Sequence, residues 1–251
     1  MRVVGLVAQM IALLLLVLAL QAQALPEVDV SSLAVSAPQL VCRLDMNVLK
    51  GEVRRMSWSP DGLYLHVQTI ERDALRDYIV ALEDKEISLA FGEPEWASSY
   101  WTRKSDLAAP GDPALKIDVI EKPQRTRPAP FAGGFSNGGA QTLDQRNSND
   151  TFAIEVSLKL LGEEVGYFLN EVAYGGITYG WGPPASGAIV FSDAKGRLSL
   201  FDRQKRKKAA PGTKDALLPA WSPDGHRVAY LEKDSRRIYR VMVTSVSRSS
   251  S

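Results

Sequence analysis

The chain has 251 residues, 45% of them hydrophobic and 24% charged, a composition of folded globular proteins that argues against disorder, collagen and coiled coil. Its 30 basic and 29 acidic residues leave a net charge of +1, so no overall field favours nucleic acid or an anionic membrane. The single cysteine, Cys42, excludes an intrachain disulfide and cysteine-rich zinc sites. Only His66 and His226 are available for histidine-based catalysis or metal binding.

The N-terminus has the organisation of a signal peptide. Met1 and Arg2 precede an almost unbroken apolar run over residues 3–20, and Ala22 and Ala24 then form a small-residue cleavage site. We expect residues 1–24 to be removed, which predicts a periplasmic or secreted protein. A retained membrane anchor is the alternative, because the run approaches the roughly 20 residues that span a bilayer.

A five-residue motif marks an internal repeat. The sequence Trp-Ser-Pro-Asp-Gly occurs at residues 58–62 and again at 221–225, and a worn copy occupies residues 181–187. Proline presets the second position of a tight turn, aspartate suits the third, and glycine accepts the positive φ that follows. This turn geometry accounts for Asp61 and Asp224 without a catalytic role.

Two further copies are indicated by spacing. The worn and last copies are separated by about 40 residues, Trp101 fits the same period, and Phe135 replaces the tryptophan in a copy over residues 135–139. Short segments rich in β-branched and aromatic residues follow the copies and are expected to be strands. They are residues 63–67, 78–82, 115–119, 152–156, 189–191, 198–201, 228–231 and 238–241.

The motif and the apolar strand behind it resemble the TolB-type β-propeller repeat, over residues 40–245. The resemblance implies an all-β fold, a β-propeller of four-stranded antiparallel blades. About five blades fit this length, with six or an incomplete ring as alternatives. The resemblance also implies that Trp58, Trp181 and Trp221 pack between blades. TolB carries a separate domain before its propeller, for which this chain has only about 20 residues, so the role of TolB is not transferred.

The remaining segments complete the expected organisation. Residues 25–39 are an N-terminal extension, residues 121–150 an irregular loop, and residues 246–251 a tail. Propeller rings normally close by pairing strands from both termini in one blade. We therefore expect residues 40–44 to pair with the C-terminal blade, unless the ring stays open.

A serine nucleophile is the first candidate for chemistry. Residues 134–138 match the G-x-S-x-G pattern around Ser136, but that pattern needs a strand before the serine and a helix after it. Prolines precede it and glycines follow it, so we expect a worn repeat turn. His226 lies directly after Gly225 and is expected to be a surface turn residue.

His66 lies within a predicted strand and is expected to be a partly buried, hydrogen-bonded histidine, with ligand binding as the alternative. Asp144, Asn147, Asn149 and Asp150 offer oxygen ligands for calcium but lack the spacing of a calcium loop. Asn149 would be glycosylated only in a eukaryotic secretory pathway.

A basic cluster, named here the 203–208 cluster, lies between two predicted strands. It consists of Arg203, Lys205, Arg206, Lys207 and Lys208. We expect a solvated hairpin tip, with an anionic glycan or phospholipid surface as the alternative partner. Nucleic acid is not expected, because stacking aromatics on an extended basic face are missing.

The sequence therefore predicts an exported binding or scaffold module for a protein, peptide or glycan of the cell envelope. No catalytic, cofactor-binding or metal-binding residue is assigned, and a membrane partner is expected only if the signal sequence is retained. A propeller enzyme, or the accessory propeller of a peptidase or polysaccharide-cleaving hydrolase, is the alternative. A truncated member of the family is a third interpretation.

Overall fold

The structure is a computed structural model that describes residues 28–72, 74–100, 107–125, 152–169, 179–184, 186–193 and 195–248. The expectations for the signal peptide, Trp101, the serine motif at 134–138 and the oxygen-rich residues 144–150 lie outside these ranges. Within them, no helix is both long and apolar enough to cross a membrane.

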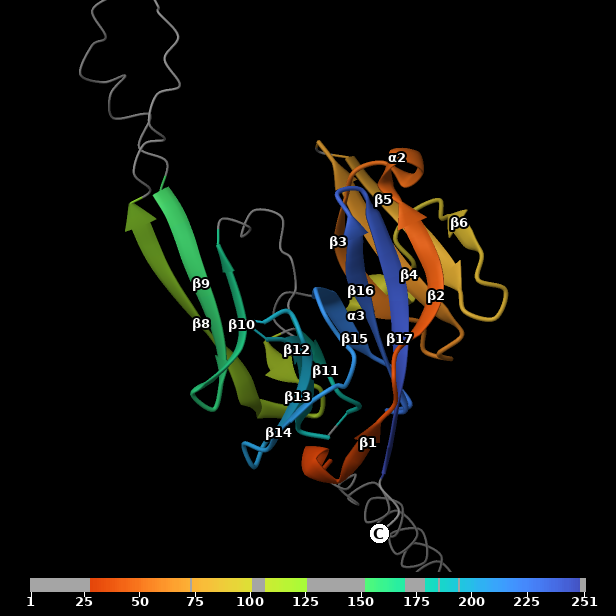
Figure 1. Ribbon diagram of the computed structural model, residues 1–251. Helices are drawn as coiled ribbons and strands as arrows, with labels where there is room; N and C mark the ends of the chain where they lie inside the picture. The colour runs from red at the N-terminus through yellow and green to blue at the C-terminus, as the bar shows by residue number, and fades with distance from the viewer. Residues whose placement is uncertain are drawn as a thin grey trace, which may run out of the picture.

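The described strands form four antiparallel sheets, named here the first to fourth blades in chain order (Figure 1). The first blade consists of β3 (Glu52–Trp58), β4 (Tyr64–Glu71), β5 (Ala74–Ala81) and β6 (Ile87–Leu89). The second consists of β7 (Ala108–Ala109), β8 (Asp112–Arg125), β9 (Phe152–Leu160) and β10 (Glu163–Leu169). The third consists of β11 (Tyr179–Trp181), β12 (Ala188–Ser192), β13 (Leu198–Asp202) and β14 (Lys207–Ala209). In these three blades each strand pairs with its neighbour along the chain.

The fourth blade contains β15 (Ala216–Trp221), β16 (Arg227–Ser235) and β17 (Ile238–Arg248), and N-terminal strands complete it. β2 (Gln39–Asp45) pairs with β17 from Asp45 opposite Ile238 to Gln39 opposite Val243. β1 (Leu33–Val35) pairs with the end of β17. The expected pairing of residues 40–44 with the C-terminal blade is confirmed. The described chain is an all-β propeller with four blades.

The short helices are η1 (Val30–Ser32), α2 (Met46–Leu49) and α3 (Glu95–Tyr100). The sheet also extends past the expected limits of the repeat, because β1 lies in the expected extension and β17 continues to Arg248 in the expected tail. Both additions have a packing reason. Leu33 and Val246 are buried in the same apolar cluster.

The described residues form four blades, where about five were expected. Residues 115–119 and 152–156 were expected in separate repeats, yet they lie in β8 and β9, which pair as neighbours with Val119 opposite Leu158. The copy expected around Phe135 therefore falls between two strands of one blade. β8 also includes residues 121–125, the start of the expected irregular loop. Strand pairing, a long-range interaction, overrides the motif spacing here.

Three apolar clusters fill three junctions between blades, and each contains a repeat tryptophan. Trp58 packs between the first and fourth blades, Trp221 between the third and fourth, and Trp181 between the second and third. Trp58 Nε1 also donates to the Ala220 carbonyl of the fourth blade at 2.9 Å. The expected packing of these three tryptophans is confirmed. These contacts place the blades in the spatial order first, fourth, third, second. In Figure 1 the first blade (β3–β6) and the second blade (β8–β10) accordingly lie at opposite ends.

Candidate functional site

The repeat motif forms the predicted tight turn in both intact copies. In the first, the Asp61 carboxylate accepts from the Leu63 N–H at 3.0 Å and is bonded by the Ser59 hydroxyl, while Gly62 has φ of 69°. The hydrogen bond from Ser59 lowers the pKa of Asp61. Asp224 repeats this arrangement, with bonds from Ser222 and from the His226 N–H. Both carboxylates are occupied by the turn, as expected from the sequence.

His66 is the centre of a buried polar cluster on the first blade. Its side chain is fully buried, and its Nε2 lies 2.8 Å from Asp77 Oδ1, which also accepts from Gln68 Nε2 at 3.0 Å. The Trp96 ring of α3 contacts the His66 ring edge-on, with centroids 6.0 Å apart. The expectation of a hydrogen-bonded histidine is met, and burial is complete rather than partial. The His66 ring therefore has no surface exposed to solvent, and its Nδ1 has no hydrogen-bond partner among the described residues.

The partners of His66 were missed in the sequence, although a signal for them exists. Gln68 follows His66 by two positions on β4 and therefore shares its face. Asp77 lies directly opposite Gln68 on β5. Polar residues that share one face of two neighbouring strands would have predicted this cluster.

The 203–208 cluster does lie at a hairpin tip, in the turn after β13 and at the start of β14, but it is less solvated than expected. Arg206 forms ion pairs with Asp29 and Asp202, both at 2.7 Å, and Arg203 pairs with Asp112 of the second blade. Lys208 donates to the carbonyls of Ser31 and Leu33. Most of these cations therefore fix the N-terminal segment and a neighbouring blade.

Other candidate groups offer little chemistry. His226 is an exposed turn residue, as expected, and burial raises the pKa of the Cys42 thiol to about 11. A thiol that stays protonated at neutral pH is a poor nucleophile and metal ligand. In the described ranges, no three His, Cys, Asp or Glu side chains gather as a metal site would require.

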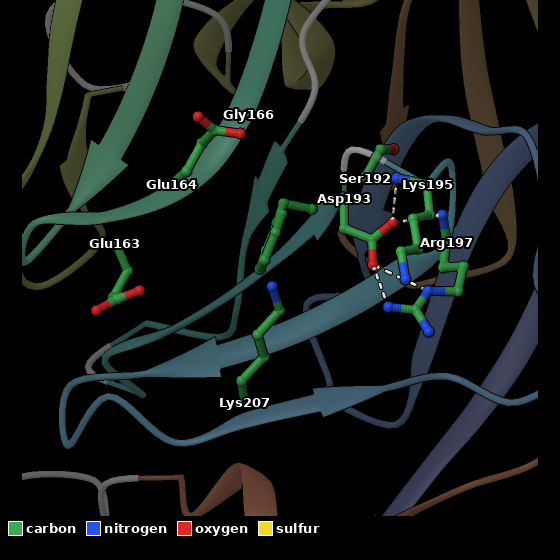
Figure 2. A pocket seen from close by; sticks show the side chains of 9 residues that line it. Glu163, Glu164, Gly166, Ser192, Asp193, Lys195, Arg197 and Lys207 are labelled. Atoms are coloured by element: carbon green, nitrogen blue, oxygen red, sulfur yellow. Dashed lines mark hydrogen bonds and ion pairs between the residues drawn. The ribbon is translucent and has the colours of Figure 1, made fainter.

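An open hollow of about 300 Å³ lies between the second and third blades and is the candidate functional site (Figure 2). Its volume is at the lower end of the range for ligand pockets. β10 supplies one wall, and the β12–β13 hairpin and β14 supply the rest. The lining residues are Glu163, Glu164, Gly166, Phe191, Ser192, Asp193, Lys195, Arg197 and Lys207.

The two walls of the hollow carry opposite charges. In Figure 2, the carboxylates of Glu163 and Glu164 project from β10, and Lys195 and Arg197 lie on the opposite side. Lys207 lies between them with its Nζ 4.9 Å from the centroid of the Phe191 ring. The hollow thus offers charges of both signs to solvent.

Some of these charges are neutralised and others are not. Asp193 accepts from Arg197 Nε at 3.0 Å and from Arg197 Nη2 at 2.8 Å. Burial acts to raise the pKa of Asp193, but its hydrogen bonds with Arg197 and Lys195 outweigh burial and lower it. Within the described part of the chain, the carboxylate of Glu163 and the ammonium group of Lys195 have no hydrogen-bond or ion-pair partner.

Comparison with known proteins finds no matching family model and no matching curated protein. Among solved structures, TolB from Acinetobacter baumannii matches with a TM-score of 0.23 and 12% identity, over 79% of this chain and 43% of that one. The Dos1 propeller matches with a TM-score of 0.24 and 7% identity, over 76% of this chain and 41% of that one. The chain spans less than half the length of either structure. The fold assignment therefore rests on the sheet topology described above.

Proposed function

We propose that this chain is an exported, non-catalytic β-propeller that binds a protein, peptide or glycan of the cell envelope. The observation that carries the proposal is the hollow between the second and third blades, which is lined by Glu163 and Lys195, two charged side chains without a partner among the described residues. Exposed charges that find no partner within the fold are available to one outside it. Loops and blade junctions of rigid scaffolds are common places for such binding.

The N-terminus supports export. The Ala22-Gln23-Ala24 site follows the apolar run, and four residues after Ala24 the Val28 N–H donates to the Ser186 carbonyl at 3.1 Å. Cleavage after Ala24 would leave only residues 25–27 before this bonded segment.

The described side chains support binding over catalysis. His66 is enclosed, the two motif aspartates are held by their turns, and the Cys42 thiol is kept protonated. General acid–base chemistry requires a titratable group within reach of a substrate. None of these groups meets that requirement.

The export and non-catalytic parts are tested on one preparation. The full chain, tagged at its C-terminus, is expressed in a Gram-negative host, and N-terminal sequencing of the periplasmic product should begin at Leu25. An active-site serine probe should label neither this product nor its Ser136→Ala variant. An intact Met1 in the membrane fraction would contradict export, and stoichiometric labelling at Ser136 would contradict the non-catalytic role.

The binding part is tested separately with the purified mature chain on a biosensor surface. Envelope protein extract, isolated peptidoglycan and a glycan array are the probes. Saturable binding to one of them is expected, and heat-unfolded protein serves as the control. Equal retention by folded and unfolded protein, or no retention of any probe, would contradict a binding function.

A further inference from the structure

The hollow between the second and third blades contains opposite charges that the fold holds apart. Glu163 lies at the start of β10, and Lys195 lies in the turn between β12 and β13. The two side chains line one hollow without forming an ion pair, although an exposed ion pair is mildly favourable when geometry permits it. β10 and the β12–β13 turn belong to different blades, so their separation is fixed by the packing of the blades. A ligand that spans the hollow can neutralise both charges.

We propose that this hollow binds an extended peptide segment that carries a basic side chain and, a few residues away, an acidic one. The inference rests on the proposed binding function and specifies its ligand class. The basic side chain of the peptide meets Glu163 and Glu164, and its acidic side chain meets Lys195 and Lys207. Electrostatic complementarity of this kind fixes the direction in which a ligand binds.

The backbone around the acidic wall favours a peptide over other ligands. Among the described strands, β10 is an edge strand that pairs only with β9, so one row of its N–H and C=O groups has no strand partner there. An extended peptide can add to such an edge through its own backbone. Gly166 brings no side chain to this part of the hollow, and the ladder between β9 and β10 is irregular between Glu164 and Gly166. A bulge of this kind changes the local twist of an edge strand.

The charges also exclude simpler ligands. A polyanion, such as nucleic acid or an acidic glycan, would be repelled by Glu163 and Glu164, which are both exposed. A polycation would be repelled by Lys195 and Lys207. A neutral glycan would leave the Glu163 carboxylate and the Lys195 ammonium group without a charged partner. A peptide that carries a basic and an acidic side chain in the right order places an opposite charge against each wall of the hollow.

The test uses the mature chain, residues 25–251, and a displayed library of short linear peptides. We expect enrichment of peptides with a Lys or Arg followed or preceded, a few residues away, by an Asp or Glu. Against the selected peptide, Glu163→Lys and Lys195→Glu should each weaken binding at least about tenfold, since each places like charges in contact. Binding should also weaken as salt is raised, because the charges are exposed.

Double reversal and a distant control make the result specific. The variant with both Glu163→Lys and Lys195→Glu should prefer peptides in which the two charged residues are exchanged. Glu83→Lys, in the exposed turn between β5 and β6, changes the net charge equally and should leave the affinity within about twofold. Thermal melts should agree across the variants, because neither Glu163 nor Lys195 has a partner to lose within the described structure.

Two results would overturn the inference. If selected peptides bind and the reversals at 163 and 195 leave their affinities unchanged, the hollow is not the site, and the proposed binding function still stands. If no peptide is enriched, the ligand class is wrong, and the probes of envelope protein, peptidoglycan and glycan then decide the proposed function separately. If every probe also fails, the proposed function falls with it.

Discussion

At the scale of single residues, the motif residues and the buried polar cluster illustrate two different uses of a carboxylate. Asp61 and Asp224 satisfy backbone N–H groups within their own turns, a local interaction that the sequence specifies completely. Asp77 instead joins two strands, because His66 and Gln68 on β4 both depend on its Oδ1. The first use can be predicted from the five-residue motif alone. The second can be predicted only when the pairing register of β4 and β5 is known.

Replacing Asp77 tests the second use. Asp77→Ala leaves buried polar groups of His66 and Gln68 without their acceptor, and each unsatisfied buried group costs about 1–3 kcal/mol. We expect the free energy of unfolding to fall by about 2–6 kcal/mol, measured by urea denaturation. Asp84→Ala, in the exposed turn after β5, is the matched control and should change it by less than about 0.5 kcal/mol. Equal midpoints for the two variants would show that the cluster does not contribute to stability.

At the scale of elements, the sequence predicted the inner strands better than the edges. Each expected strand segment overlaps a strand of the structure, because alternating apolar residues reflect burial on one face. The strands that were not predicted all lie at sheet edges: β1, β3, β6, β7, β10, β11, β14 and β15. β14, for example, has only three residues, Lys207–Ala209. It forms a strand because its backbone pairs with β13, and its own residue pattern does not predict a strand. The blade count failed for the same reason, since pairing joined two segments that spacing had separated.

The repeat tryptophans give the sharpest test at this scale. Trp221 is 3% exposed and packs among residues of the third and fourth blades, so Trp221→Ala should lower the free energy of unfolding by about 3–5 kcal/mol. Phe91→Ala is the control, because Phe91 is a large apolar side chain that lies fully exposed, and it should cost little. Denaturant melts of both variants check the prediction. A loss below about 1 kcal/mol for Trp221→Ala would mean that this aromatic does not hold the two blades together.

At the scale of the whole molecule, the candidate site could not be predicted from the sequence. Glu163 and Lys195 are separated by about 30 residues and belong to different blades, and each alone is typical of an ordinary exposed charge. Their relation depends on the junction between the second and third blades. The ends of the chain were more predictable, because closure of a propeller imposes a pairing between them.

The N-terminal segment joins distant parts of the molecule through several kinds of contact. The Val30 N–H donates to Asp202 Oδ2 of the third blade at 3.1 Å, and Asp29 pairs with Arg206 beside it. β1 and β2 then lie along the outer edge of β17 in the fourth blade. One continuous segment thus fastens the third blade to the fourth and covers the edge of the last strand.

Removing this segment is therefore expected to unfold the molecule or loosen it severely. A chain that begins at Glu52 loses the buried side chains of Val30, Leu33, Leu44 and Met46. At about 1.5–3 kcal/mol for each buried side chain, the loss is about 6–12 kcal/mol, which is comparable with the whole stability of a typical domain, about 5–15 kcal/mol. We expect a non-cooperative thermal transition, monitored by tryptophan fluorescence, and partial recovery when a peptide of residues 25–51 is added in excess. A chain that begins at Val28 is the control and should melt like the chain that begins at Leu25. Cooperative unfolding of the Glu52 chain at an unchanged midpoint would show that the propeller is complete without strands from its N-terminus.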